Sequence, residues 1–103
     1  FGPIGPWLVT KDDAGDVTNL PMWLKVNEKI YQNSNTKMMI FHPNFLVSYL
    51  SNYMSLQSGD IISTGTPSGV GMGQKPPIFL KAGDIMELGI KNLGEQRQTV
   101  IST

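Results

Sequence analysis

The residues best suited to bind a ligand lie where an apolar run ends in small polar residues, at residues 61–68 (Ile-Ile-Ser-Thr-Gly-Thr-Pro-Ser). Such an ending leaves hydroxyl and backbone N–H groups at the tip of the run, where no bulky side chain blocks a ligand. The N–H groups near Gly65, Thr66 and Ser68, together with the Thr66 hydroxyl, could form a concave site for a carboxylate. A plain Gly-Pro loop between two strands is the alternative interpretation of the same residues.

Other patterns that carry chemistry are absent or incomplete. His42 is the only histidine and precedes a proline at a helix start, so we interpret it as structural rather than as a general base. Asp12, Asp13 and Asp16 lack the spacing and distal Glu of a calcium loop, which favours a solvated turn over calcium binding. No cysteine and no Glu-x-Glu or His-x-x-x-His pair is present. We therefore expect no metal site and no catalytic residue on this chain by itself.

Composition excludes several classes of partner. The 103 residues hold 8 basic and 8 acidic side chains and have a formal net charge of +0. The chain therefore has no net positive charge to attract nucleic acid or an anionic membrane surface. The longest apolar run, residues 38–41, is too short to span a bilayer. These features, with the lack of cysteine, lead us to expect a cytoplasmic protein. The start at Phe1, without an initiator Met, suggests a piece of a longer polypeptide.

The elements that would position residues 61–68 are mostly β. Alternating or β-branched runs predict a strand at residues 7–10, a hairpin formed by residues 22–26 and 29–32, and strands at 61–64, 85–90 and 96–101. Residues 11–19 and 65–77 are expected to be loops, and the Gly59-Asp60 and Gly83-Asp84 steps to be turns.

A single helix is predicted near residues 42–54, because Pro43 suits a first helical turn. Its apolar residues fall on one face at helical spacing, and we expect that face to join the core. These residues are Phe45, Leu46, Tyr49, Leu50 and Tyr53.

Five motifs in order resemble the C-terminal half of the fumarylacetoacetate hydrolase family, over essentially the whole chain. They are residues 2–10 (GPIGPWLVT), 23–27 (WLKVN), 35–41 (NTKMMIF), 58–71 (SGDIISTGTPSGVG) and 80–84 (LKAGD). The resemblance implies that residues 1–103 are the C-terminal portion of a catalytic domain of this family, with its mixed β-sandwich roll. Family members act on 2-oxo and β-diketo acids by hydrolytic C–C cleavage, decarboxylation or isomerisation.

The resemblance also implies a cofactor and a substrate contact. A divalent ion, Mg²⁺ or Mn²⁺, chelates the substrate in this family and stabilises the enolate that forms. Its Glu-x-Glu and Asp ligands would precede Phe1, so this chain carries no metal ligand. The residues that carry over are Thr66, as a donor to the substrate carboxylate, and Gly65, which permits close approach. Asn35 and Thr36 fit the family pattern as packing positions.

Two hypotheses about function remain open. In the first, the chain is part of a metal-dependent enzyme that acts on 2-oxo acids and assembles as a homodimer or higher homo-oligomer, as family members commonly do. In the second, it is a non-catalytic β-rich structural or self-association unit, since the family's metal ligands are missing from the sequence.

Overall fold

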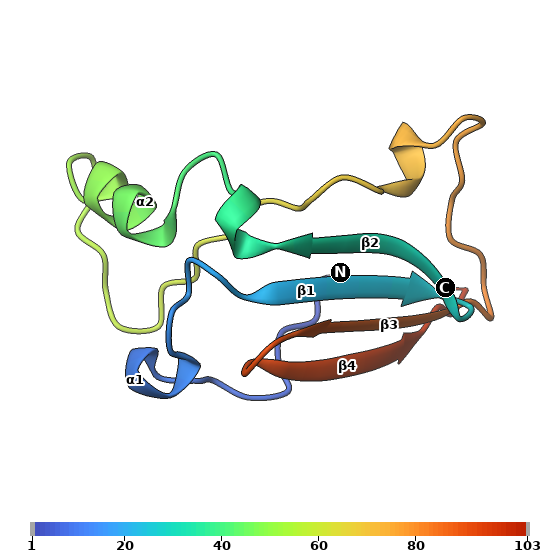
Figure 1. The fold of residues 1–103 in the computed structure, drawn as a ribbon, viewed down its shortest axis with the longest axis horizontal. Helices are drawn as coiled ribbons and strands as arrows, with labels where there is room; N and C mark the ends of the chain where they lie inside the picture. The colour runs from blue at the N-terminus through green and yellow to red at the C-terminus, as the bar shows by residue number, and fades with distance from the viewer. Residues whose placement is uncertain (1, 103) are drawn as a thin grey trace.

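The computed structural model describes residues 2–102 and contains one four-stranded antiparallel sheet with the strand order β2-β1-β3-β4 (Figure 1). The strands are β1 (Pro21–Val26), β2 (Lys29–Asn35), β3 (Ile85–Ile90) and β4 (Gly94–Thr99). The helices are α1 (Lys11–Ala14) and α2 (Pro43–Leu50), with short 3-10 turns η1 (Thr36–Met38) and η2 (Gly71–Gly73). The expectation of a mostly β chain with one main helix is confirmed.

The predicted hairpin forms around Asn27 and Glu28, which both have positive φ angles of 48° and 69°. Two consecutive left-handed residues match the twist of the flanking strands, and Asn tolerates this conformation well. The Asn27 side chain also joins this turn to the start of β3. Its amide nitrogen donates to the Asp84 carboxylate at 2.9 Å, and its oxygen accepts from the backbone N–H of Ile85 at 2.9 Å.

The two faces of the sheet differ in polarity. Residues that lie opposite each other on neighbouring strands share a face, and one row across the sheet runs Gln32, Leu24, Leu88 and Gln96. The face with this row also carries half-buried apolar side chains, namely Met22, Val26, Met86 and Ile90. On the opposite face, Arg97 lies 3.5 Å from Glu87 in a solvent-exposed ion pair. The first face is therefore the apolar face, and the second is the polar face.

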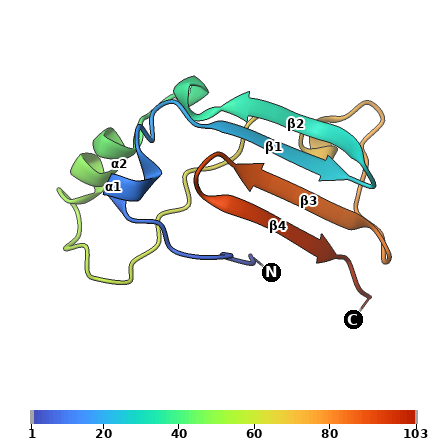
Figure 2. The same ribbon diagram turned by 60° about the horizontal axis from the view of Figure 1, so that its bottom comes forward.

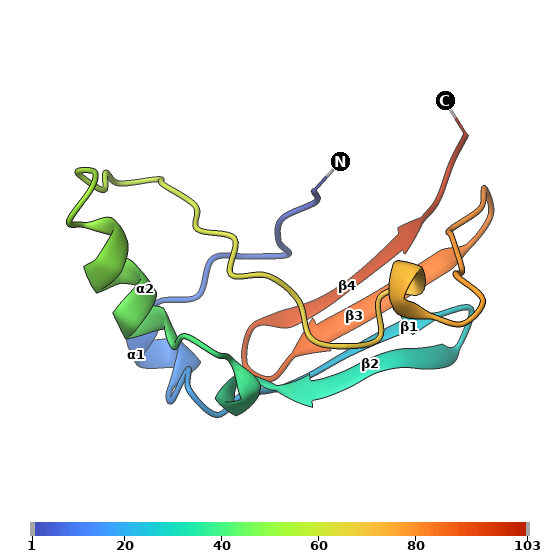
Figure 3. The ribbon, with the colours of Figure 1, turned by 90° about the horizontal axis from the view of Figure 1, so that it is seen from above.

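Two predicted strands are wrong. Residues 7–10 form no strand, because Pro6 and Trp7 meet the β4 side of the sheet through side-chain contacts with Gly94 rather than through a backbone ladder (Figure 2). Residues 61–64 are extended without pairing to a strand, and residues 64–69 then lie alongside β2 (Figure 3). Residues 11–14, expected in a loop, form α1.

The helix α2 begins where expected, with His42 as N-cap and Pro43 in the first turn, but ends at Leu50, earlier than predicted. The expectation that its apolar face joins the core is wrong. The ring centroids of Phe41, Phe45, Tyr49 and Tyr53 follow one another at 5.0, 5.9 and 5.1 Å, and all four side chains are at least half exposed. No other helix or strand among residues 2–102 packs extensively on α2, so these rings contact mainly one another.

The core of the described part of the chain is small, because Ala14 and Leu20 are its only buried apolar side chains. Leu20 donates its backbone N–H to the Thr36 hydroxyl at 2.8 Å, and the Thr36 N–H donates to the Leu20 carbonyl at 2.9 Å. Thr36 thus fixes the segment before β1 to the end of β2, which is the packing role expected for it. None of the helices in residues 2–102 has the length and apolar character needed to cross a membrane.

Candidate functional site

Gly65 and Thr66 lie at the mouth of a cavity of about 640 Å³ between residues 64–68 and the apolar face of the sheet. Both residues are solvent-exposed. The rest of the lining comes from the start of β1, the ends of β2 and β3, η1, residues 39–41 and α2. The lining residues are Met22, Ser34, Asn35, Thr36, Met38, Met39, Ile40, Phe41, Leu46, Thr64, Gly65, Thr66, Pro67, Ser68 and Ile90.

The backbone N–H donors at the cavity mouth have no hydrogen-bond partner in the described part of the chain. Gly65 has φ +91°, a backbone conformation that residues with a side chain rarely adopt, and no atom lies within 4 Å of the place where a Cβ would stand. Within the described residues, no protein acceptor bonds the backbone N–H groups of Gly65, Thr66 or Ser68. Three N–H donors and one hydroxyl are thus close together at the surface, without a bulky group over them.

Two close contacts hold residues 66–69 against β2. The side-chain nitrogen of Gln32 donates to the Thr66 hydroxyl oxygen at 2.9 Å and to the Pro67 carbonyl at 2.8 Å. A Cβ on Gly69, which has φ +110°, would stand 1.9 Å from the Tyr31 carbonyl oxygen, so only glycine allows this approach. The sequence singled out Gly65 and Thr66 but not Gln32 or Gly69, because nothing in the linear order brings β2 to this segment.

The other residues considered for chemistry lie elsewhere. His42 is exposed at the start of α2 and its side chain makes no capping hydrogen bond, which fits the structural interpretation. Asp13 accepts from the Thr10 hydroxyl at 2.9 Å. Asp16 accepts from the hydroxyl and the N–H of Thr18, and these bonds lower the pKa of its carboxyl group. Asp13 and Asp16 therefore bond to local groups, as expected for a solvated turn.

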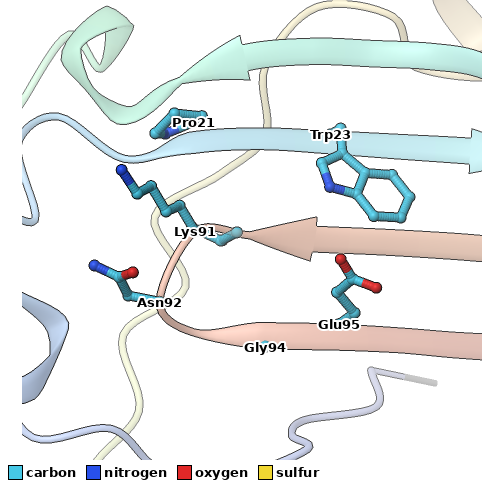
Figure 4. Close-up of a pocket in the computed structure, with 7 residues that line it drawn as sticks. Pro21, Trp23, Lys91, Asn92, Gly94 and Glu95 are labelled. Carbon is cyan, nitrogen blue, oxygen red and sulfur yellow. The ribbon is translucent and has the colours of Figure 1, made fainter.

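A second, smaller hollow of about 290 Å³ lies at the end of the sheet, as Figure 4 shows. Trp23 on β1 and Glu95 on β4 point toward each other across β3 (Figure 4). They meet above Gly89, where a Cβ would stand 3.0 Å from both side chains. Lys91 and Asn92 complete one rim, and the Asn92 amide donates to the Ala14 carbonyl at 3.2 Å. The Asn92 bond joins the β3–β4 turn to α1, and no sequence motif predicted it.

Comparison with known proteins decides the family. The model for the fumarylacetoacetate (FAA) hydrolase C-terminal domain matches residues 1–101. The chain belongs to the fumarylacetoacetate hydrolase family. The family resemblance in the sequence is therefore confirmed, and so is the fold expected from it.

Individual members of this family are similar to the chain over nearly all its length. A relative from Burkholderia cenocepacia (strain HI2424), whose name gives the class hydrolase and no substrate, is 59% identical over 99 residues, which are 95% of this chain and 35% of the relative. A fumarylacetoacetate hydrolase structure from Exiguobacterium antarcticum has a TM-score of 0.92 and 37% identity, and the match covers 98% of this chain and 36% of that one. The chain thus spans about a third of the length of the curated relatives it matches.

A third relative bears on the metal that the family implies. Maleylpyruvate hydrolase from Sphingobium sp. SYK-6, solved with manganese(II) and pyruvate, has a TM-score of 0.85 and 37% identity, and the match covers 96% of this chain and 35% of that one. Residues 2–102 of the present chain contain no group of three His, Cys, Asp or Glu side chains able to hold a metal ion. The described residues therefore do not fit a divalent metal site, and any such ion would need ligands from outside them.

Proposed function

We propose that this chain is part of a divalent-metal-dependent enzyme of the fumarylacetoacetate hydrolase family that acts on 2-oxo or β-diketo acids. The part we assign to the chain itself is to bind the substrate carboxylate at Gly65 and Thr66. Mg²⁺ or Mn²⁺, held by residues outside the described part, would supply the electron withdrawal that such reactions need.

The observation that carries this proposal is the exposed set of donors at residues 65–68 on the rim of the 640 Å³ cavity. The N–H groups and the hydroxyl lie within four consecutive residues, and no positive side chain lines the cavity, which suits one carboxylate rather than a multiply charged phosphate. The cavity walls below them are largely apolar, with Met22, Met39 and Ile90 among them. The carbon chain of a small oxo acid would lie against these walls while its carboxylate stays at the rim.

The role of Thr66 is tested by replacing it with valine, which removes the hydroxyl while nearly preserving shape. The assay uses the longest natural polypeptide that contains these residues, with Mg²⁺ or Mn²⁺ and acylpyruvate, oxaloacetate or hydroxymuconate-type substrates. Loss of one charge-assisted hydrogen bond costs roughly 1.5 to 3 kcal/mol, so we expect kcat/KM to fall about 10- to 150-fold.

Thr66→Ser is the matched control, because it keeps the hydroxyl and removes only a methyl group. We expect it to retain most of the activity that Thr66→Val loses. Equal kcat/KM for the parent and Thr66→Val, with both proteins folded, would show that the hydroxyl does not contact the substrate.

The rival proposal is a structural or self-association unit, which the exposed rings of Phe41, Phe45, Tyr49 and Tyr53 favour. Under this proposal the 103-residue chain binds no Mg²⁺ and forms oligomers through these rings. Isothermal titration with Mg²⁺ tests the first point, since micromolar binding by the chain alone would contradict it. Sedimentation of the chain with and without Phe45→Ser tests the second, because a shift toward monomer is expected only if the rings form the contact.

A further inference from the structure

Gln32 is the one polar side chain that is buried among residues 2–102, at 9% exposure. It projects from the middle of β2 on the apolar face, directly opposite Leu24. Its amide nitrogen donates at 2.9 Å to the Thr66 hydroxyl oxygen and at 2.8 Å to the Pro67 carbonyl. Both hydrogens of the amide are therefore used on the segment that carries the candidate carboxylate site.

The Pro67 carbonyl fixes which way the Gln32 amide points. A carbonyl oxygen only accepts, so the group that faces it must be the NH₂ end rather than the oxygen end. The same NH₂ group contacts the Thr66 hydroxyl, and an amide nitrogen has no lone pair to offer. Thr66 must therefore accept from Gln32, and its own hydrogen has to point elsewhere.

No acceptor in the described part of the chain takes that hydrogen. From this we infer that Gln32 is a positioning residue, which holds the Thr66 hydroxyl as a donor aimed at the substrate carboxylate. The inference depends on the carboxylate contact proposed above for Thr66. A hydroxyl can normally rotate either to donate or to accept. Because the Gln32 NH₂ group donates to the Thr66 oxygen, the Thr66 hydroxyl cannot donate toward Gln32.

The surroundings of Gln32 keep this arrangement rigid. A Cβ on Gly69 would stand 3.1 Å from the Gln32 Cγ and 1.9 Å from the Tyr31 carbonyl, so the backbone of the loop lies directly on β2 at this point. The Gln74 amide further donates to the Gly69 carbonyl at 3.3 Å. A donor that is already oriented before the ligand arrives loses less free energy to reorganisation when it binds.

The decisive variant is Gln32→Glu, which reverses the hydrogen bond. An ionised glutamate accepts from the Thr66 hydroxyl and so withdraws the hydrogen from the substrate, whereas a protonated glutamate can donate as glutamine does. We expect kcat/KM relative to the parent to be lowered about 10- to 150-fold near pH 8 and to recover as the pH falls toward about 4. Gln32→Met, which neither donates nor accepts, should show a smaller and pH-independent loss.

Gln98→Met is the matched control, because Gln98 is a half-buried glutamine on the same face of the sheet, at the opposite edge. We expect it to leave kcat and KM unchanged. If Gln32→Glu lowers kcat/KM as much as Gln32→Met does, and equally at every pH, the inference is overturned. Such a loss would come from altered packing, which does not depend on pH.

Two outcomes separate the carboxylate contact of Thr66 from the positioning role of Gln32. If Thr66→Val leaves kcat/KM unchanged, the carboxylate contact is wrong. If Thr66→Val is impaired but Gln32→Glu behaves like Gln98→Met, the contact holds and the positioning role is wrong.

A measurement on the unsubstituted protein avoids variants that fail to fold. With Mn²⁺ replaced by diamagnetic Mg²⁺, the side-chain amide signals of Gln32 should shift in NMR spectra when pyruvate is added, because its acceptor Thr66 becomes a donor to the carboxylate. Signals that stay in place while pyruvate binds would overturn the inference.

Discussion

Replacing Gly69 with alanine should displace the site-bearing loop from β2. Gly69 has φ +110°, and its Cβ would meet the Tyr31 carbonyl oxygen at 1.9 Å and the Tyr31 carbonyl carbon at 2.9 Å. Both obstacles are backbone atoms, so neither can rotate away. Gly59 provides a matched control, because its φ is +95° but no atom lies within 4 Å of its would-be Cβ.

The two substitutions share one cost and differ in another. A non-glycine residue at such a φ costs about 1 to 2 kcal/mol, and this applies to Gly59→Ala and Gly69→Ala alike. Forcing a methyl group into an occupied space adds about 1 to 3 kcal/mol at Gly69 alone. We therefore expect the free energy of unfolding to fall by about 1 to 2 kcal/mol for Gly59→Ala and by about 2 to 5 kcal/mol for Gly69→Ala.

Urea unfolding of the longest natural polypeptide, followed by fluorescence, measures both losses, and kcat/KM measures the effect on the site. Gly69→Ala should lower kcat/KM while Gly59→Ala leaves it unchanged, because only the first moves residues 66–69 away from Gln32. Equal losses of stability in the two variants, with unchanged activity in both, would refute the tight approach of this loop to β2.

Two further perturbations test the fold. Hydrogen bonds from the Asn27 amide and from the Lys81 backbone N–H hold the pKa of Asp84 below its ordinary value of 3.8. The ionised Asp84 carboxylate therefore stabilises the fold above pH 3.8, and this stabilisation is lost as the pH falls through the lowered pKa. Asp84→Asn should remove this acid-induced loss of stability, as measured by urea midpoints from about pH 5 down to about pH 2. An unchanged dependence of the midpoint on pH would contradict the prediction. Leu20→Ala should cost about 2 to 5 kcal/mol in urea unfolding because Leu20 is 4% exposed, whereas Leu8→Ala, at 96% exposed, should stay within about 0.5 kcal/mol, and similar losses would place Leu20 outside the core.

The sequence predicted the elements whose formation depends on local chemistry. The hairpin around Asn27 and Glu28 was found because alternating strands flank residues able to turn, and β3 and β4 were found in the same way. The turn at Gly83 and Asp84 has its expected positive φ, and the Asp84 side chain accepts from the Lys81 N–H at 2.8 Å. Each of these features is closed by groups only a few residues apart.

The errors fall where a distant partner decides the outcome. Residues 61–64 have strand-like composition, but no strand pairs with them in the described part of the chain. The rings of Phe45 and Tyr49 have the spacing of a core-facing helix, yet whether such a face is buried depends on what packs against it. Periodicity shows that a face is apolar, and it carries no information about its neighbour.

The sequence by itself determined the family, the segments of β1 to β4 and the hydroxyl and N–H groups around Thr66, because each depends on the order of neighbouring residues. Only the tertiary structure decided that Gln32, 34 residues earlier, donates to the Thr66 hydroxyl, and that Gly69 lies against Tyr31. The direction of a hydroxyl hydrogen depends on which donor or acceptor lies within 3 Å of it, and the folded backbone alone brings β2 to that position.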